Sequence, residues 1–442
     1  MKVVRAINNI SDEIKNHKFI WLYYVLMMLL LVSWTDHTSA PPEMYRYAFM
    51  ALLFIPLFFD RRNITLFVLI CFYTVGLYGI GYSYMPNRSI PYMIILAFLV
   101  LTHNKKNAIT FRGWGAIVLF GVYTIIVDII GLSSFSGYLL LSESRKWTIM
   151  IILLLPFFLS NNRVLDTEKI SFAFIIAALI MSLQFFLLGG NVAASYDYHS
   201  GIDRIAWMDP NYFCPVLGMG IILSMMTLIE KKTNLIFKVL LIATIILSFV
   251  AVVMSASRGS LIAVAVSVAV VVFFSRIKKR YKLLIIIVLA VFIVVIYNMG
   301  YFDLLEYRLE GGTNSTSGSG RYQIWTMKLN AFFRNINVLS LLFGVGFDGG
   351  FYLGSDSGLG FHNDFLAFFC CYGLVGIISF FYILFRPVFL TPKKYRSHVL
   401  ASAIFLAAVG LTVEPMCNLY LPYWFFLFYI YCKASSYAIN NH

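Results

Sequence analysis

Apolar runs long enough, or nearly long enough, to cross a lipid bilayer follow one another along almost the whole chain. A transmembrane helix needs about 20 mainly apolar residues. Hydrophobic residues make up 60% of the sequence and charged residues only 12%, and a soluble domain could not bury so much apolar surface. The expected spans lie near residues 19–34, 46–59, 64–84, 89–103, 112–131, 147–160, 169–189, 211–229, 234–257, 259–275, 283–299, 362–385, 398–414 and 419–433.

These runs predict an all-α integral membrane protein with about 14 transmembrane helices (12–14). We expect residues 1–442 to form a single polytopic membrane domain. The six cysteines are scattered within or beside apolar runs. That pattern is typical of small buried hydrophobes, and it indicates neither a metal site nor a disulfide framework.

The net charge of +14 is explained by membrane topology. Most Lys and Arg residues lie in alternate connecting segments, among them SRIKKRYK and RPVFLTPKKYR. The positive-inside rule places such segments, and with them both termini, in the cytoplasm. The lipid bilayer is therefore the expected partner, and no nucleic acid is needed. The first apolar run is expected to be an anchor rather than a cleaved signal.

Two long segments, 190–210 and 300–361, fall on the opposite, external face in this topology. Long segments outside the membrane usually carry function or disorder. Apolar residues at helical spacing over 321–333 predict a short amphipathic helix on the outer leaflet, with Trp325 at headgroup level. The glycine-rich stretch 344–360 allows the backbone to approach a ligand closely, although a mobile loop without a ligand is equally compatible.

Three arginines on the external face are candidate ligands for an anionic group: Arg204, Arg258 and Arg321. Arg258 lies at a tight turn between two spans, where it could equally be an interfacial anchor. Arg321 begins the amphipathic helix and opposes its dipole, a cost that a bound diphosphate would offset. Guanidinium groups bind phosphate oxygens bidentately, so two or more of them directed at one point predict a diphosphate site.

His362 stands before Asn363 and Asp364 at the start of an apolar run. Asn and Asp favour helix starts, so a simple cap explains these two residues but does not require an imidazole. A neutral imidazole beside the arginines could accept a proton from an attacking hydroxyl. Gly373 and Gly376 are expected to share one helical stripe with His362 and to let a neighbouring helix pack closely.

The chain resembles the bacterial O-antigen ligase/polymerase family in four motifs spread over roughly residues 200–390. These motifs are DPNYF at 209–213, SRG at 257–259, SGRYQIW at 319–325 followed by FGVGFDGG, and His-Asn followed after nine residues by G-x-x-G. The first motif adds Asp209 and Asn211 as supporting residues, at a turn that opens the next span. The order and spacing of the four motifs make the resemblance more specific than any one motif does.

The resemblance implies a membrane glycosyltransferase whose donor is an undecaprenyl-diphosphate-linked oligosaccharide and whose acceptor is a glycan lipid. Arg258 and Arg321 would hold the diphosphate, and His362 would activate the acceptor hydroxyl. No metal or cofactor is implied. The site would face the periplasm or the outside of the bacterial inner membrane, and a chain-length regulator and a flippase would be further partners.

The resemblance allows either a polymerase, which elongates a lipid-linked repeat unit, or a ligase, which transfers glycan to lipid A–core. An arginine followed eleven residues later by glycine, described for some polymerases, is absent, because Pro215, Ala269 and Phe332 occupy those positions. DPNYF and the expectation of 14 rather than 12 spans favour a polymerase of O-antigen or capsule. A flippase would instead show charges along a path through the bilayer and related halves. A non-catalytic assembly partner would use His362 only in a cap.

Overall fold

The computed structural model describes part of the chain, and its described part is helical except for one small antiparallel sheet. The expected spans near 19–34, 46–59, 64–84, 89–103 and 147–160, together with Asp209, lie outside the described residues. The structure describes residues 115–134, 167–187, 195–197, 202–204, 210–230, 233–310, 320–334, 336–354, 360–417 and 421–439.

Each expected span within these residues coincides with a helix. By length and composition, α9, α10, α12 and α17 can cross a membrane, and α6, α8, α11 and α18 contain shorter apolar stretches. The predominantly helical class is therefore confirmed for the described residues, with four helices able to span a membrane, while the number of 14 spans stays a prediction. The helices are α6 (Gly115–Ser134), α8 (Thr167–Leu187), α9 (Pro210–Glu230), α10 (Leu235–Met254), α11 (Arg258–Phe274), α12 (Lys279–Asn298), α17 (Asp364–Leu390), α18 (Arg396–Gly410) and α19 (Leu421–Ile439).

The two long segments predicted to be external contain secondary structure of their own. In the first, β1 (Ser195–Asp197) pairs antiparallel with β2 (Ile202–Arg204), with Ser195 opposite Arg204, a hairpin that the sequence did not predict. The described part of the second is mostly helical, and α14 occupies the place of the expected amphipathic helix. Its elements are α13 (Asp303–Glu310), α14 (Arg321–Arg334), α15 (Val338–Phe343) and α16 (Gly346–Tyr352).

Small residues let the membrane helices pack closely. A Cβ added at Gly220 of α9 would come within 2.2 Å of the Ala178 side chain on α8. Ser182 of α8 and Ser248 of α10 share a buried hydrogen bond of 2.9 Å between their hydroxyls. Such small-residue contacts and interhelical hydrogen bonds are typical of membrane bundles.

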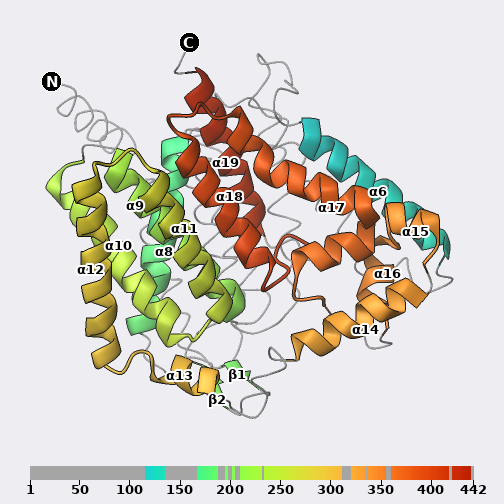
Figure 1. Cartoon of the computed structure of the whole chain (residues 1–442), viewed down its shortest axis with the longest axis horizontal. Helices are drawn as coiled ribbons and strands as arrows, with labels where there is room; N and C mark the ends of the chain where they lie inside the picture. The colour runs from blue at the N-terminus through green and yellow to red at the C-terminus, as the bar shows by residue number, and fades with distance from the viewer. Residues whose placement is uncertain are drawn as a thin grey trace, which may run out of the picture.

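Helix α12 exposes apolar side chains around its circumference, including Leu283, Leu284, Ile286 and Val288. A helix with this distribution is stable only where an apolar medium surrounds it, since water would disfavour the exposed surface. This arrangement agrees with a lipid-facing helix at the edge of the described bundle (Figure 1).

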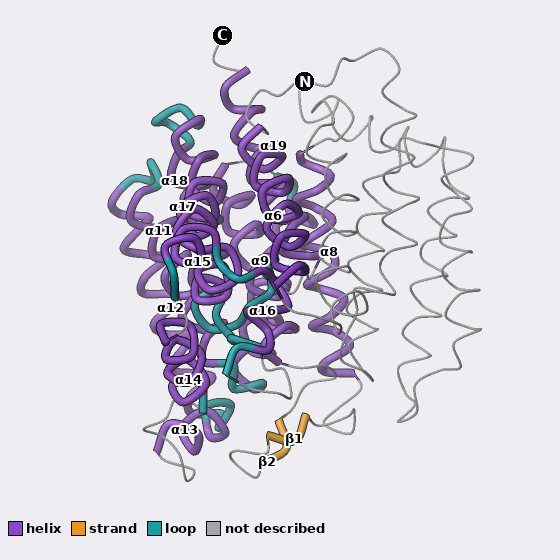
Figure 2. Tube along the Cα trace, turned by 90° about the vertical axis from the view of Figure 1, so that its right-hand side faces the viewer, coloured by secondary structure: helices purple, strands orange, loops and turns teal. Residues whose placement is uncertain are grey.

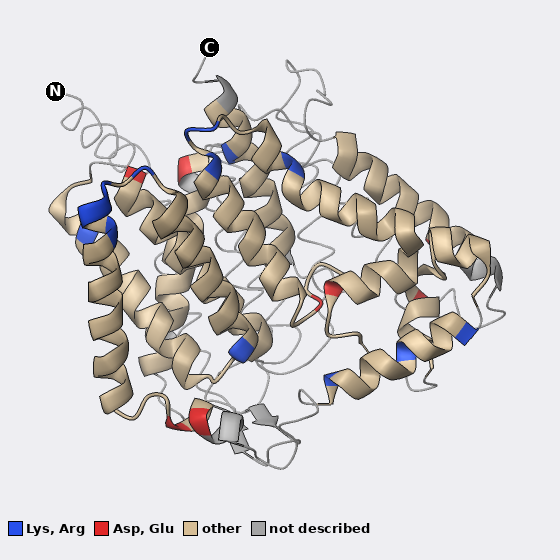
Figure 3. Ribbon diagram, in the orientation of Figure 1, with Lys and Arg blue, Asp and Glu red and all other residues tan. Residues whose placement is uncertain are grey.

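The segments assigned to the two faces of the membrane lie at opposite ends of the molecule. The hairpin, α13 and α14 lie together at one end in both views (Figures 1 and 2). The basic segments that join α11 to α12 and α17 to α18 lie at the other end (Figure 3). Since α11 ends and α12 begins there, the turn that starts α11 lies at the same end as α13. Which end faces the cytoplasm remains a prediction.

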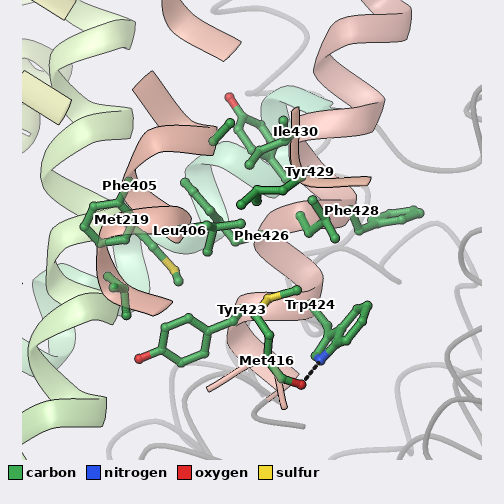
Figure 4. Close-up of a cluster of buried hydrophobic side chains, with 14 of the residues drawn as sticks. Met219, Phe405, Leu406, Met416, Tyr423, Trp424, Phe426, Phe428, Tyr429 and Ile430 are labelled. Carbon is green, nitrogen blue, oxygen red and sulfur yellow. Dashed lines mark hydrogen bonds between the residues drawn. The ribbon is translucent and has the colours of Figure 1, made fainter. Parts of the chain in front are cut away.

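Aromatic side chains of α19 occupy the centre of the core (Figure 4). Phe426 packs edge-on between Phe174 of α8 and Phe405 of α18, with ring centroids 5.3 and 6.1 Å away. The indole Nε1 of Trp424 donates to the Met416 carbonyl at 3.0 Å. The core therefore holds in place the segment that follows α18, which forms part of the candidate site.

Helix α17 bends sharply at Gly373, whose φ of 66° and ψ of −165° lie outside the helical region. A Cβ there would come within 2.4 Å of the Leu342 carbonyl on α15. The Tyr123 hydroxyl of α6 donates to the Tyr372 carbonyl at 2.6 Å, just before the bend. The prediction that Gly373 and Gly376 share a helical stripe with His362 is wrong, because the helix is interrupted at Gly373 and His362 lies before its start.

Candidate functional site

His362 lies in a tight turn that leads into α17, and its backbone is unusual. Its φ is +49°, a left-handed conformation that residues other than glycine adopt rarely and at a cost in energy. The next residue, Asn363, caps α17 by accepting hydrogen bonds from the N–H groups of Phe365 and Leu366 at 2.9 and 3.1 Å. The cap fixes where the helix begins, and the imidazole is held one residue before it, partly buried.

Residues 411–417, which follow α18, hold this turn through hydrogen bonds in both directions. Glu414 is buried, and its Oε2 accepts from the Phe361 N–H at 2.6 Å. Asn363 Nδ2 donates to the Leu411 carbonyl at 3.2 Å. The fully buried Asp364 accepts from the N–H groups of Met416 and Cys417 at 3.2 and 2.8 Å. The His362 turn and residues 411–417 therefore form one hydrogen-bonded unit.

Arg258 begins α11 beside that same unit. The preceding turn includes Ala256 at φ +49°, and Ser257 shares a hydrogen bond of 2.9 Å with Ser260 at the helix start. A Cβ added at Gly259 would lie 2.2 Å from Thr412 Oγ1, so the backbone next to Arg258 is in direct contact with residues 411–417. The Arg258 side chain is partly exposed.

Arg321 begins α14, which contacts the His362 turn from another direction. Trp325, one helical turn further on, donates from Nε1 to the Phe361 carbonyl at 2.7 Å. Lys328 follows on the same face, because residues at i, i+4 and i+7 of a helix lie in one row. The indole of Trp325 thus contacts the protein backbone, a contact that the sequence did not predict.

Lys328 is a fully buried cation. Its Nζ donates to the carbonyls of Gly350 and Phe351, both at 2.9 Å. Burial lowers the pKa of Lys328 below its ordinary value of 10.5, and the negative charge of nearby groups, including Glu414, opposes this effect. The charge of Lys328 is therefore strongly dependent on its protein partners.

The structure thus connects three of the predicted site residues through short contacts. Arg258 lies beside residues 411–417, Arg321 lies on the helix bonded to Phe361, and His362 follows Phe361 directly. The other predicted residues lie on other elements. Arg204 ends β2 in the hairpin, and Asn211 is the second residue of α9.

The glycine-rich stretch packs against α17. A Cβ at Gly344 would lie 2.2 Å from the Cys371 carbonyl oxygen, and one at Gly350 would lie 2.3 Å from Cys371 Sγ. At these two positions the close backbone approach serves helix packing, a role that differs from both sequence-based alternatives, close approach to a ligand and a mobile loop. Residues 355–359 of the stretch lie outside the described residues.

Three buried charged residues were not identified as site candidates from the sequence: Lys328 and Glu414, which both contact Phe361, and Asp128, which contacts α16. Asp128 is buried on α6, and its Oδ1 accepts from the Phe347 N–H at 2.9 Å. A carboxylate inside an apolar run is itself a signal of a special role. Lys328 could have been identified from the sequence as a site candidate, because it lies on the same face of the expected helix as Arg321 and Trp325. Glu414 ends an expected span and carries no such local signal.

The described part of the chain contains no group of three or more His, Cys, Asp or Glu side chains arranged to hold a metal ion. The charged and titratable groups around the His362 turn are arginines, carboxylates, one lysine and one imidazole.

The middle part of the chain matches a known family. Residues 243–381 match the family model described as O-Antigen ligase. The matched stretch extends from α10 to beyond the bend in α17, and it contains Arg258, Arg321 and His362. No curated protein matches the sequence.

Proposed function

Starting from the match to the O-antigen ligase family, we propose that the protein is a membrane glycosyltransferase with an undecaprenyl-diphosphate-linked glycan as donor. The match supports an activity of the ligase or polymerase type. Within that class we propose polymerisation of the repeat units of a surface polysaccharide, either O-antigen or capsule. DPNYF at residues 209–213 and the expectation of 14 rather than 12 spans favour this choice over transfer to lipid A–core.

One observation carries the proposal. The turn with His362, the helix start with Arg258 and the helix with Arg321 all meet at Phe361 and residues 411–417. These segments are far apart in the sequence, and each carries a residue suited to one part of glycosyl transfer. A cap for α17 would need Asn363 alone, whereas the arrangement also holds an imidazole in a strained backbone conformation.

In the proposed reaction, the His362 imidazole takes the proton of the acceptor hydroxyl. The acceptor oxygen forms a bond to the anomeric carbon of the donor sugar. The bond from that carbon to the diphosphate oxygen breaks, and undecaprenyl diphosphate leaves with the electron pair. Negative charge grows on the leaving group, and the guanidinium groups of Arg258 and Arg321 stabilise it. The proposal requires no metal and no cofactor.

The proposed site lies at the outer face of the bacterial inner membrane. The hairpin, α13 and α14 belong to the two long segments that were expected to be external, and they lie at one end of the molecule (Figure 1). The basic segments that join α11 to α12 and α17 to α18 lie at the other end (Figure 3). Lipid-linked donors present their glycan at a membrane surface, so a site that includes α14, at one end of the bundle, fits such a substrate (Figures 1 and 2). A transport path would instead require polar residues through the bilayer.

Reconstitution of the purified protein with undecaprenyl-diphosphate-linked repeat units tests the proposal. A polymerase yields longer lipid-linked chains and releases undecaprenyl diphosphate when the donor is the only substrate. A ligase yields product only when lipid A–core is added. No product with either acceptor, under conditions in which the protein is folded, would contradict the proposed function.

A deletion strain gives an independent answer. Single repeat units on lipid A–core would indicate a lost polymerase, and polymer retained on undecaprenyl diphosphate would indicate a lost ligase. Unchanged surface polysaccharide would contradict both.

A further inference from the structure

The side chain of Lys328 is buried, so its ammonium group is not hydrated by solvent. The residue is completely buried, and its Nζ lies close to three carbonyls at the end of α16, those of Gly350 and Phe351 at 2.9 Å and that of Leu353 at 3.5 Å. Cations are favoured at the C-terminal end of a helix, where carbonyls lack partners. The ammonium therefore joins α14 to α16.

The same ammonium also contacts the residue before His362. Nζ of Lys328 lies 4.5 Å from the centre of the Phe361 ring, a distance suited to a cation–π interaction. Trp325, on the same face of α14, donates to the Phe361 carbonyl, and Glu414 accepts from the Phe361 N–H. Side chain, carbonyl and N–H of Phe361 are thus all held by different partners.

A buried charge is an expensive way to hold two helices together. An apolar side chain of similar volume often gives equal or greater stability, because burying a charge carries a large desolvation cost. What the ammonium adds is direction, since its donors fix the positions of several carbonyls at once. Stability alone therefore does not explain Lys328, and alignment of the segments around it does.

We propose that Lys328 is a positioning residue that fixes the helix carrying Arg321 against the turn carrying His362. It contacts no substrate in this proposal. Arg321 lies two helical turns before Lys328 on the same row, so a rotation or shift of α14 moves the guanidinium relative to the imidazole. The inference rests on the proposed function, in which these two groups act on one substrate.

The variant Lys328→Met tests this role, because it keeps most of the side-chain volume and removes the donors. A misplacement of about 1 Å can lower a reaction rate about 100-fold, so we expect kcat to fall by about 10- to 100-fold. Arg258 and Arg321 both remain, so we expect the KM for the lipid-linked donor to change less than about 3-fold. Both constants are measured with reconstituted protein, per amount of folded protein.

Tyr431→Phe is the matched control. It removes a buried hydrogen bond of 2.8 Å from the Tyr431 hydroxyl to the Ile383 carbonyl, between α19 and α17 and outside the proposed site. We expect it to lower thermal stability without changing kcat. A Lys328→Met variant with wild-type kcat, or with a loss that only follows its folded fraction, would overturn the inference.

Two further arms keep the result decisive. If Lys328→Met does not insert and fold, Trp325→Phe tests the same link by removing the donor to the Phe361 carbonyl; reduced kcat supports the inference, and wild-type kcat overturns it. His362→Ala in the same assay separates the two proposals. Transfer by His362→Ala contradicts the proposed role of the imidazole, whereas its inactivity beside a fully active Lys328→Met contradicts the positioning role alone.

Discussion

Single charged side chains hold the backbone around His362. Asp364, after the His362 turn, accepts hydrogen bonds from two backbone N–H groups of residues 411–417, and Glu414 accepts one from the Phe361 N–H in that turn. Each carboxyl group therefore satisfies backbone donors of the other segment. An unsatisfied buried N–H costs about 1–3 kcal/mol. The left-handed conformation of His362 persists because these neighbours fix the residues on both sides of it.

Arg258 gives the residue-scale prediction. In Arg258→Gln the guanidinium no longer stabilises the charge that grows on the leaving diphosphate, and we expect kcat to fall about 100-fold, a loss of about 3 kcal/mol of transition-state stabilisation. Arg258→Lys keeps the charge but not the bidentate geometry, so it should recover only part of the rate. Steady-state kinetics with reconstituted protein measure both variants.

Arg280→Gln is the control for this experiment. Arg280 lies in the first turn of α12, at the end of the molecule that carries the basic segments (Figure 3). We expect its kcat to equal that of the wild type. Equal losses in the Arg258 and Arg280 variants would show that net charge, rather than the position of Arg258, determines the rate.

At the scale of the element, the bend in α17 is the feature that most affects the site. The first part of α17 carries the cap beside His362, and the second part continues as a membrane helix. Gly373 joins them at a φ of 66° and a ψ of −165°, a conformation that is essentially restricted to glycine, in direct contact with the end of α15. The bend therefore sets the direction in which α17 leaves the His362 turn.

Gly373→Ala should lower the stability of the folded protein by about 1–3 kcal/mol, since the added Cβ has both an unfavourable φ and a close contact with α15. Gly373→Asn serves as the companion variant. Asn tolerates the left-handed helical region, but the ψ of −165° at Gly373 lies outside that region, and the Asn Cβ meets the same Leu342 carbonyl, so we expect a similar loss. Thermal unfolding in detergent measures both. A stable variant of either kind would contradict the requirement for glycine at the bend.

The bend in α17 could not be predicted from the sequence. Apolar length predicted a helix from near residue 362, and Asn363 predicted its start. A glycine within an apolar run is compatible with either a continuous helix or a break. The choice depends on α15 and on Tyr123 of α6, which are distant in sequence and leave no local periodic signal.

At the scale of the whole molecule, composition and apolar length predicted the helical membrane class and the places of the described spans. The relation between segments was beyond such reasoning. Residues 411–414 were expected to end the span at 398–414, and residues 415–418 to be only a short external connection, yet residues 411–417 join the turns of Arg258 and His362. That role depends on hydrogen bonds between residues about 50 or more positions apart, which hydrophobic patterns do not encode.

The topology provides the whole-molecule prediction. A reporter active only in the cytoplasm should be active when fused after Lys278 and silent when fused after Gly300, because the first site follows a basic segment and the second ends α12 at the opposite end. The same pair with a reporter active only outside the cytoplasm should give the reverse pattern. Activity of the cytoplasmic reporter at Gly300 would place the candidate site on the wrong side of the membrane for the proposed reaction.

The most direct test of the account is glycan transfer by purified His362→Ala in vesicles that contain undecaprenyl-diphosphate-linked repeat units. We predict that this variant folds and still binds the donor, because Arg258 and Arg321 remain, but forms no longer chains. Asn363→Ala in parallel should lose about 1 kcal/mol of stability with its helix cap and retain transfer. Near-normal transfer by His362→Ala at equal amounts of folded protein would contradict the account and place the base elsewhere.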